Sequence, residues 1–370
     1  MNSSINTENR LYGLDHLRAL AIILVFFFHY QFPIFGHPEW VDHFDKFGWA
    51  GVDLFFVLSG FLISSQLFLQ IQQGKQIAFK AFFLKRFFRI LPTYWVVLAI
   101  YFYFPLFREN QGLSPLWKFL TFTQNFGLYT KDFGSFSQAW SLCVEEHFYF
   151  LLPILLFFLQ FNDRLKRSYW ILIILFILGF FLRYYSWKHL YLPKMNDENA
   201  LYYWNEYIYY PTYNRLDGLL IGVAIAGIYR FLPDVWSKIT QRGNQFIISG
   251  ILLLLSLDLV FQRDYSFTVS VFAFPLVNIA FGCLLIGAVS PTSILYKTRS
   301  KTTGLIAELS YSIYLIHKGT IHLMQELFTG ININSNLMLV PCILFSVAAA
   351  WAIHLIVEKP FMRWRKKLVS

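Results

Sequence analysis

Ten mostly apolar stretches run through this chain, and each is long enough to cross a bilayer as a helix of about 20 residues. Only 14% of the 370 residues are charged and 56% are hydrophobic, whereas soluble domains carry roughly 25% charged residues. We therefore expect an all-α integral membrane protein, a polytopic bundle of about ten transmembrane helices. The windows fall near residues 13–32, 48–70, 91–107, 138–160, 168–187, 209–231, 244–262, 269–290, 304–328 and 337–358.

Lys and Arg are concentrated in alternate connectors between these windows. With the N-terminus placed in the cytoplasm, most of them fall in the inside connectors, including a basic amphipathic segment at 76–92 and the tail from about residue 360. This asymmetry follows the positive-inside rule and predicts that both termini are cytoplasmic. We expect a single domain over residues 1–370. The long outside connector 108–137 is rich in aromatic residues, so we expect it to lie along the membrane interface.

Other features of the composition argue against several classes of function and site. The net charge of +10 comes from these topology signals, so we expect no nucleic-acid partner. The three cysteines, Cys143, Cys283 and Cys342, lie in apolar segments and predict neither a disulfide framework nor a metal site. The first apolar window lacks a cleavage site, so we expect it to remain as the first helix.

Ionisable residues inside the apolar windows are the informative ones. Each costs roughly 2.5–3.5 kcal/mol at the centre of a membrane helix and is a functional candidate. By the predicted topology, several helices place such groups at a similar depth in the outer half, which favours a shared site. The residues at that depth are His29, Asp53, Glu145, Arg215, Asp217 and His317.

Arg18 and His29 share one face of the first helix, because 11 residues make three turns to within about 20° and rise about 16 Å. We expect this face to point into the bundle. Glu146 is one residue from Glu145, so the two cannot face the same point.

Structural explanations compete with functional ones at several of these positions. Asp53 could cap its helix or pair with Arg215, and His29 could be a hydrogen-bonded buried histidine. Arg183 is expected to extend to the interface, and His354 to be an ordinary packed histidine. Ser59 is interpreted as a small residue that lets helices approach.

Seven motifs, in order, resemble those of the acyltransferase-3 family of membrane acyltransferases, and the resemblance covers nearly the whole chain. They are 15-DHLRALAIILVFFFH-29, 51-GVDLFFVLSGFLIS-64, 85-KRFFRILPTYW-95, 139-AWSLCVEEHFYFLLP-153, 214-NRLDGLLIGV-223, 309-LSYSIYLIHKG-319 and 357-VEKPFMR-363. Many members carry an extra extracytoplasmic hydrolase-like domain, and we expect none in this chain.

The resemblance implies an activity and a set of site residues. Members move an acyl group, commonly acetyl, from cytoplasmic acyl-CoA to a hydroxyl of an extracytoplasmic or lipid-linked glycan. It implies that His29 is catalytic, that Glu145 activates or orients the acceptor or the histidine, and that Arg86 and Arg89 hold the phosphates of the acyl-CoA cofactor. From the residues themselves we add Asp53 as a further catalytic candidate and Arg18 as a further residue of the acyl-CoA site. The remaining motif residues are expected to bind substrate or support the site: Arg215, Asp217, Tyr311, Tyr314, His317, Trp140, Ser141 and Glu146.

The chemistry of these residue types agrees with acyl transfer to a hydroxyl. Acyl transfer to a hydroxyl needs a base, which a neutral imidazole can supply near working pH. A carboxylate such as Glu145 or Asp53 could fix the tautomer of His29, and guanidinium groups suit phosphates. His29 could act as a general base in direct transfer, which we favour, or accept the acyl group itself.

We therefore expect an acetyl-CoA-dependent O-acetyltransferase of the bacterial inner membrane. Its expected partners are the lipid bilayer, acyl-CoA and a glycan acceptor, with lipopolysaccharide O-antigen or capsule preferred. Peptidoglycan or a small-molecule acceptor is an alternative. A proton-coupled transporter would also need buried ionisable groups, but the chain lacks inverted repeats and paired broken helices. A non-catalytic scaffold would not need the basic inside segment and the outer carboxylates together.

Overall fold

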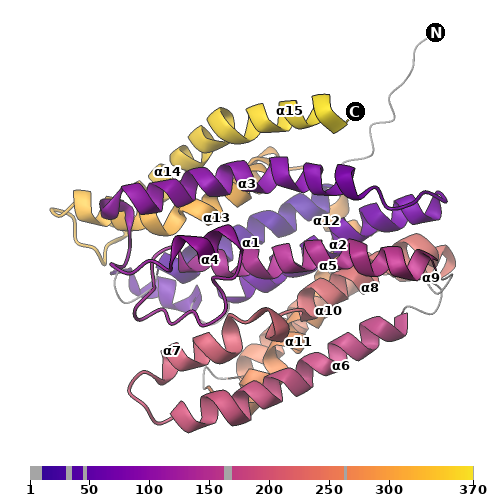
Figure 1. The fold of residues 1–370 in the computed structure, drawn as a ribbon, viewed down its shortest axis with the longest axis horizontal. Coiled ribbons are helices and arrows are strands. Elements are labelled where there is room, and N and C mark those ends of the chain that lie inside the picture. The colour runs from indigo at the N-terminus through magenta and orange to yellow at the C-terminus, as the bar shows by residue number, and fades with distance from the viewer. Residues whose placement is uncertain (1–10, 31–35, 45–47, 162–168, 262–264, 370) are drawn as a thin grey trace.

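A computed structural model describes residues 11–30, 36–44, 48–161, 169–261 and 265–369, and within these ranges the chain contains helices and no strand. Figure 1 shows the long helices running along a common direction. The all-α membrane class is thereby confirmed. The α-helices are α1 (Tyr12–Tyr30), α2 (Ala50–Gln72), α3 (Phe79–Tyr103), α4 (Leu116–Leu120), α5 (Trp140–Phe161), α6 (Tyr169–Tyr185), α7 (Ala200–Trp204), α8 (Asp217–Phe231), α9 (Pro233–Thr240), α10 (Gly243–Val260), α11 (Phe274–Val289), α12 (Ile294–Lys297), α13 (Lys301–Leu327), α14 (Asn336–Ile353) and α15 (Lys359–Val369).

Seven helical spans among the described residues are long and apolar enough to cross a membrane, or eight if the bent pair α8 and α9 counts as one. The sequence predicts about ten. The two further windows correspond to α3 and α13, which are long helices but more polar. The basic segment 76–92 is helical from Phe79 onward, and the same helix, α3, continues through Pro92 to Tyr103.

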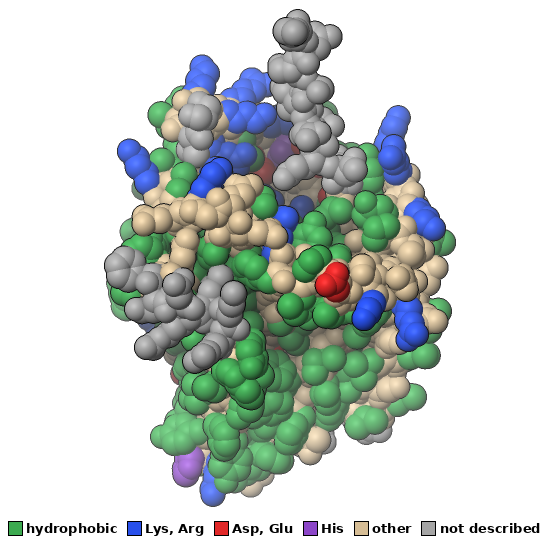
Figure 2. Space-filling model, turned by 90° about the vertical axis from the view of Figure 1, so that its right-hand side faces the viewer, with side chains coloured by type: hydrophobic (Ala, Val, Ile, Leu, Met, Phe, Trp, Pro, Cys, Tyr) green, Lys and Arg blue, Asp and Glu red, His purple; other side chains and the backbone are tan. Residues whose placement is uncertain are grey.

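The lateral surface of the bundle is apolar. Exposed Leu, Ile and Phe side chains cover α6, α10 and α14, for example Phe181, Leu252 and Leu344. Figure 2 shows the end of the molecule that lies on the right of Figure 1, where Lys and Arg side chains gather. Basic residues at one end are typical of a cytoplasmic face.

Two glycines allow α2 and α8 to pack closely. A Cβ atom at Gly60 would collide with the carbonyl group of Leu219, and one at Gly222 with that of Val57. Small residues at such contacts are typical of membrane helices, because helix association there depends on close van der Waals packing. The crossing fixes α2, which carries many of the residues of the site described below.

The connector between α3 and α5 folds back against the bundle. Phe119 and Phe136 are fully buried, and Tyr94 of α3 donates a hydrogen bond to the Phe119 carbonyl over 3.1 Å. Lys318 of α13 pairs with Glu109 at 2.8 Å, with both side chains buried. Leu116, Trp117 and Leu120 remain exposed. The connector is therefore part of the core, and only its outer apolar residues match the interfacial expectation.

Candidate active site

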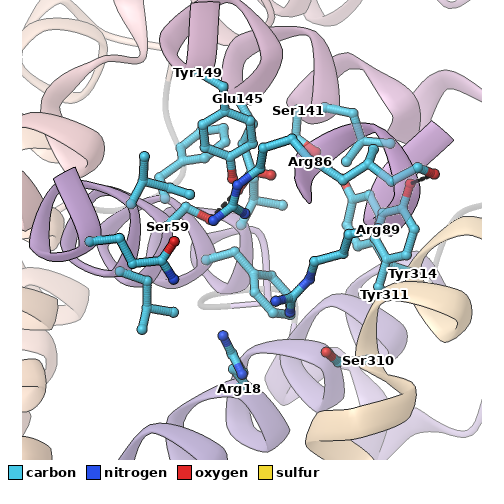
Figure 3. Close-up of a pocket in the computed structure, with 18 residues that line it drawn as sticks. Arg18, Ser59, Arg86, Arg89, Ser141, Glu145, Tyr149, Ser310, Tyr311 and Tyr314 are labelled. Carbon is cyan, nitrogen blue, oxygen red and sulfur yellow. Dashed lines mark hydrogen bonds between the residues drawn. The ribbon is translucent and has the colours of Figure 1, made fainter. Parts of the chain in front are cut away.

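A cavity opens between five helices, and it encloses about 960 Å³, including the part open to solvent. Its polar lining comes from α1, α2, α3, α5 and α13, as Figure 3 shows. The polar lining residues are Arg18, Ser59, Gln66, Arg86, Arg89, Ser141, Glu145, Tyr149, Ser310, Tyr311 and Tyr314.

Three arginines from two helices face this cavity. Arg86 and Arg89 lie three positions apart on α3, which puts them on one side of the helix, and Arg18 approaches from α1. The guanidinium carbon of Arg86 lies 5.2 Å from the centroid of the Tyr149 ring. None of the three forms an ion pair with a described residue. The cavity thus offers concentrated positive charge, which suits an anionic ligand.

Glu145 is the carboxylate of the cavity. It accepts a hydrogen bond from Ser59 Oγ at 2.6 Å, and both residues line the cavity. The sequence alone suggests a packing role for Ser59. The signal that places it in the cavity is spacing, because the lining residues of α2 recur every three or four positions and so share a helical face. These residues are Val52, Phe55, Phe56, Ser59, Leu62, Ile63 and Gln66.

His29 lies outside the cavity lining, paired with His317. His29 Nδ1 is 3.0 Å from His317 Nε2 and 3.0 Å from the carbonyl oxygen of Val25. Tyr314 connects this pair to the cavity, because it lines the cavity and its ring centroid lies 6.0 Å from that of His317. Tyr314 therefore links the histidine pair to the cavity that the three arginines face.

The hydroxyl of Tyr314 is held in place by α5 and the residues just before it. It donates to the carbonyl oxygen of Gln138 over 2.7 Å and lies 2.5 Å from Ser141 Oγ. Tyr311 lies one turn earlier on α13 and donates to the Ile90 carbonyl over 2.9 Å. Both tyrosines are thus fixed by contacts with neighbouring helices and shape the cavity wall.

Asp53 and Arg215 form a buried ion pair away from the cavity lining, at 2.8 Å. The Arg215 guanidinium also lies over the rings of Trp140, Tyr209 and Phe274, at 5.3, 4.6 and 4.0 Å. The structure therefore shows the pairing that we considered as the structural alternative for Asp53. Its contacts join α2 to the segment preceding α8 and to the start of α11.

Arg183 is fully buried and does not extend to the interface as expected. It pairs with Asp217 at 2.5 Å and donates to the Asn214 carbonyl over 2.9 Å. The expectation was wrong because the partner lies on α8, which is distant in sequence. His354 is also more than a packed histidine, since its two nitrogens contact Glu308 and Glu358 at 3.0 and 2.8 Å.

Glu146 does not line the cavity, whereas its neighbour Glu145 does, as expected from the 100° turn between consecutive helical residues.

No set of three or more His, Cys, Asp or Glu residues suited to a metal ion occurs in the described part of the chain. The ligand group that fits this site is anionic, because the cavity presents three guanidinium groups.

Comparisons with known proteins agree with this architecture. A sequence model of an acyltransferase domain matches residues 11–355. The peptidoglycan O-acetyltransferase OatA of Listeria monocytogenes is 29% identical over 329 residues, which are 82% of this chain and 48% of that protein. The O-acetyltransferase OatA of Staphylococcus aureus is 26% identical over 321 residues, 82% of this chain and 49% of that protein.

The chain spans about half the length of these curated relatives. No solved structure matches it. The domain match covers nearly all of the helical bundle and includes every residue that lines the cavity. The chain therefore belongs to the acyltransferase-3 family of membrane acyltransferases.

Proposed function

We propose that this chain is an O-acetyltransferase that moves an acetyl group from acetyl-CoA, bound from the cytoplasmic side, to a hydroxyl of a cell-envelope glycan. The observation that carries the proposal is the cavity itself, which combines Arg18, Arg86 and Arg89 with the carboxylate of Glu145. The relatives are named as O-acetyltransferases, which supports acetyl as the group transferred.

The three arginines are the proposed binding site for the phosphates of acetyl-CoA. Guanidinium groups form planar, bidentate contacts with phosphate oxygens. The positive-inside pattern supports a cytoplasmic position for the α3 arginines, on the side where CoA is found. The acyl arm would then extend through the cavity toward Tyr314 and the histidine pair, with the bilayer-spanning helices keeping water out.

His29 is the proposed general base. The acceptor hydroxyl oxygen attacks the thioester carbonyl carbon while His29 takes the hydroxyl proton. The carbon–sulfur bond then breaks, and the departing thiolate takes that proton from the imidazolium. Glu145, held by Ser59, would orient the reacting groups. A base of this kind contributes about 10²- to 10⁴-fold to rate.

Peptidoglycan is the acceptor that we favour, because the Listeria relative is named as a peptidoglycan O-acetyltransferase. This preference replaces the O-antigen or capsule favoured on sequence grounds. A surface polysaccharide remains the second candidate, since the same chemistry would act on any glycan hydroxyl presented at the outer side.

The test measures O-acetyl groups on purified peptidoglycan and on surface polysaccharide, from cells with and without this protein, by mild base release and mass spectrometry. We expect an acetyl increment on peptidoglycan that disappears in His29→Ala and persists in His189→Ala, an exposed histidine outside the site. Unchanged acetylation in His29→Ala would overturn the assignment of the base. An increment on surface polysaccharide alone would replace the acceptor.

A further inference from the structure

The histidine pair joins α1 to α13 in the interior of the protein. The exposed fraction of His29 is 8% and that of His317 is 0%. Their ring centroids lie 4.9 Å apart, and the two nearest nitrogens are 3.0 Å apart. One of those nitrogens must donate and the other must accept, so the proton positions can be worked out from the other partners.

The tautomer of His317 follows from two backbone carbonyls. Its Nδ1 lies 3.0 Å from the oxygen of Ile313 and 2.8 Å from that of Tyr314. A carbonyl oxygen only accepts, so Nδ1 carries the proton, and in a neutral imidazole Nε2 then has the lone pair. A second proton would create a buried cation beside the buried Lys318, which is costly.

The tautomer of His29 follows in turn. Its Nδ1 faces two acceptors, the carbonyl oxygen of Val25 and Nε2 of His317. Nδ1 therefore carries the proton, and Nε2 of His29 holds the lone pair. This is the form in which Nε2 can act as a base, as the proposed function requires.

We propose that His317 is a positioning residue for His29. It takes the role that a carboxylate could have had in fixing the tautomer, because Glu145 contacts Ser59 and Asp53 contacts Arg215. The inference rests on the proposed function for its role in catalysis, whereas the tautomer assignment stands on the hydrogen bonds alone.

His317 also has a role after proton transfer. When Nε2 of His29 gains the acceptor proton, the ring becomes an imidazolium, and its Nδ1–H bond to His317 becomes charge-assisted and stronger. His317 cannot pass a proton further, because its own Nδ1 proton is held by two carbonyls. The proton therefore stays on His29 until the thiolate takes it.

The competing explanation is packing alone. Phe26 and Tyr314 flank His317, with ring centroids 6.2 and 6.0 Å away, and any planar ring of similar size would fill this space. Three substitutions separate the two roles. In His317→Gln the amide oxygen can occupy the place of Nε2 and accept from His29. In His317→Asn the shorter side chain cannot reach that place. In His317→Phe the ring stays, but the atom that accepts from His29 is lost.

The kinetic test uses purified full-length protein in proteoliposomes, with acetyl-CoA and soluble peptidoglycan fragments. We expect His317→Gln to keep a kcat close to wild type. His317→Asn and His317→Phe should lose about 10- to 100-fold in kcat, less than the loss of a whole base, because the Val25 carbonyl still accepts from Nδ1. The KM for acetyl-CoA should not change. Wild-type kcat in His317→Phe would overturn the proposal.

A second measurement separates this inference from the proposed function. Nitrogen-15 NMR of histidine-labelled protein, without substrate, reports which ring nitrogen is protonated, and the His29 signals are identified by their loss in His29→Ala. We expect the Nδ1–H form in wild type and in His317→Gln. The Nε2–H form in wild type would overturn the positioning role even if acetyl transfer is observed. The Nδ1–H form would support that role even if these fragments are not acetylated, a result that would count against the proposed function alone.

Discussion

Arg215 donates a hydrogen bond from Nη2 to Oδ2 of Asp53 over 2.8 Å, and the other oxygen of that carboxylate accepts from Asn278 Nδ2 over 3.0 Å. Both oxygens of Asp53 are therefore engaged by residues that are distant in sequence. The carboxylate links α2 with α11 and with the segment preceding α8, and these contacts suit a structural role.

We predict that Arg215→Met lowers the stability of the detergent-solubilised protein by about 3–5 kcal/mol, because it leaves the buried carboxylate of Asp53 without its cation. Thermal unfolding followed by size-exclusion chromatography measures this. The double variant Asp53→Leu/Arg215→Met should recover much of the loss. An Asp53→Asn variant with wild-type stability and no activity would instead show that Asp53 takes part in the reaction.

The close crossing of α2 and α8 makes a second prediction. Gly222→Ala should destabilise the protein, since the added Cβ would meet the backbone of Val57 and Phe61. Overpacking of this kind costs about 1–3 kcal/mol. Gly227→Ala is the matched control on the same helix, because its nearest contact would be a Phe68 ring carbon at 3.9 Å. Equal melting temperatures for the two variants would contradict this view of the interface.

The arginines of α3 give a third prediction. Arg86→Glu/Arg89→Glu should raise the KM for acetyl-CoA about tenfold or more, since each charge-assisted bond to phosphate is worth about 1.5–3 kcal/mol. Lys85→Glu reverses one charge on an exposed residue that does not line the cavity, and it should leave KM unchanged. If Lys85→Glu raises KM as much as the arginine changes, the effect comes from general surface charge.

The cavity carboxylate gives a fourth prediction. Glu145→Gln keeps the shape and the acceptor for Ser59 but removes the charge, and we expect kcat to fall about 10²-fold or more. Ser59→Ala should cause a smaller loss, because it removes only the hydrogen bond at 2.6 Å. Glu146→Gln is the comparison, since its side chain does not line the cavity. Full activity in Glu145→Gln would exclude a role for its charge.

The membrane class and the residues worth studying could be read from the sequence. Helices that the ten apolar windows predict are present in the structure, and the structure brings Arg18, Arg86, Arg89 and Glu145 to one cavity. The ion-pair and hydrogen-bond partners of buried polar residues could not be predicted from the sequence. Arg183 pairs with Asp217 and His354 with two glutamates, where we expected an interfacial arginine and a packed histidine.

Ser59 and His317 show what cannot be predicted from the sequence alone. Their residue types and helical faces are visible in the sequence, but Ser59 acquires its role only from Glu145 on α5, and His317 from His29 on α1.

The sequence by itself determined which segments are apolar enough to enter a membrane, because transfer free energy adds up residue by residue along a helix. Only the tertiary structure decided which buried polar groups meet. That depends on the rotation and crossing of packed helices 8–10 Å apart, where a shift of one residue turns a side chain by 100° and gives it a different partner.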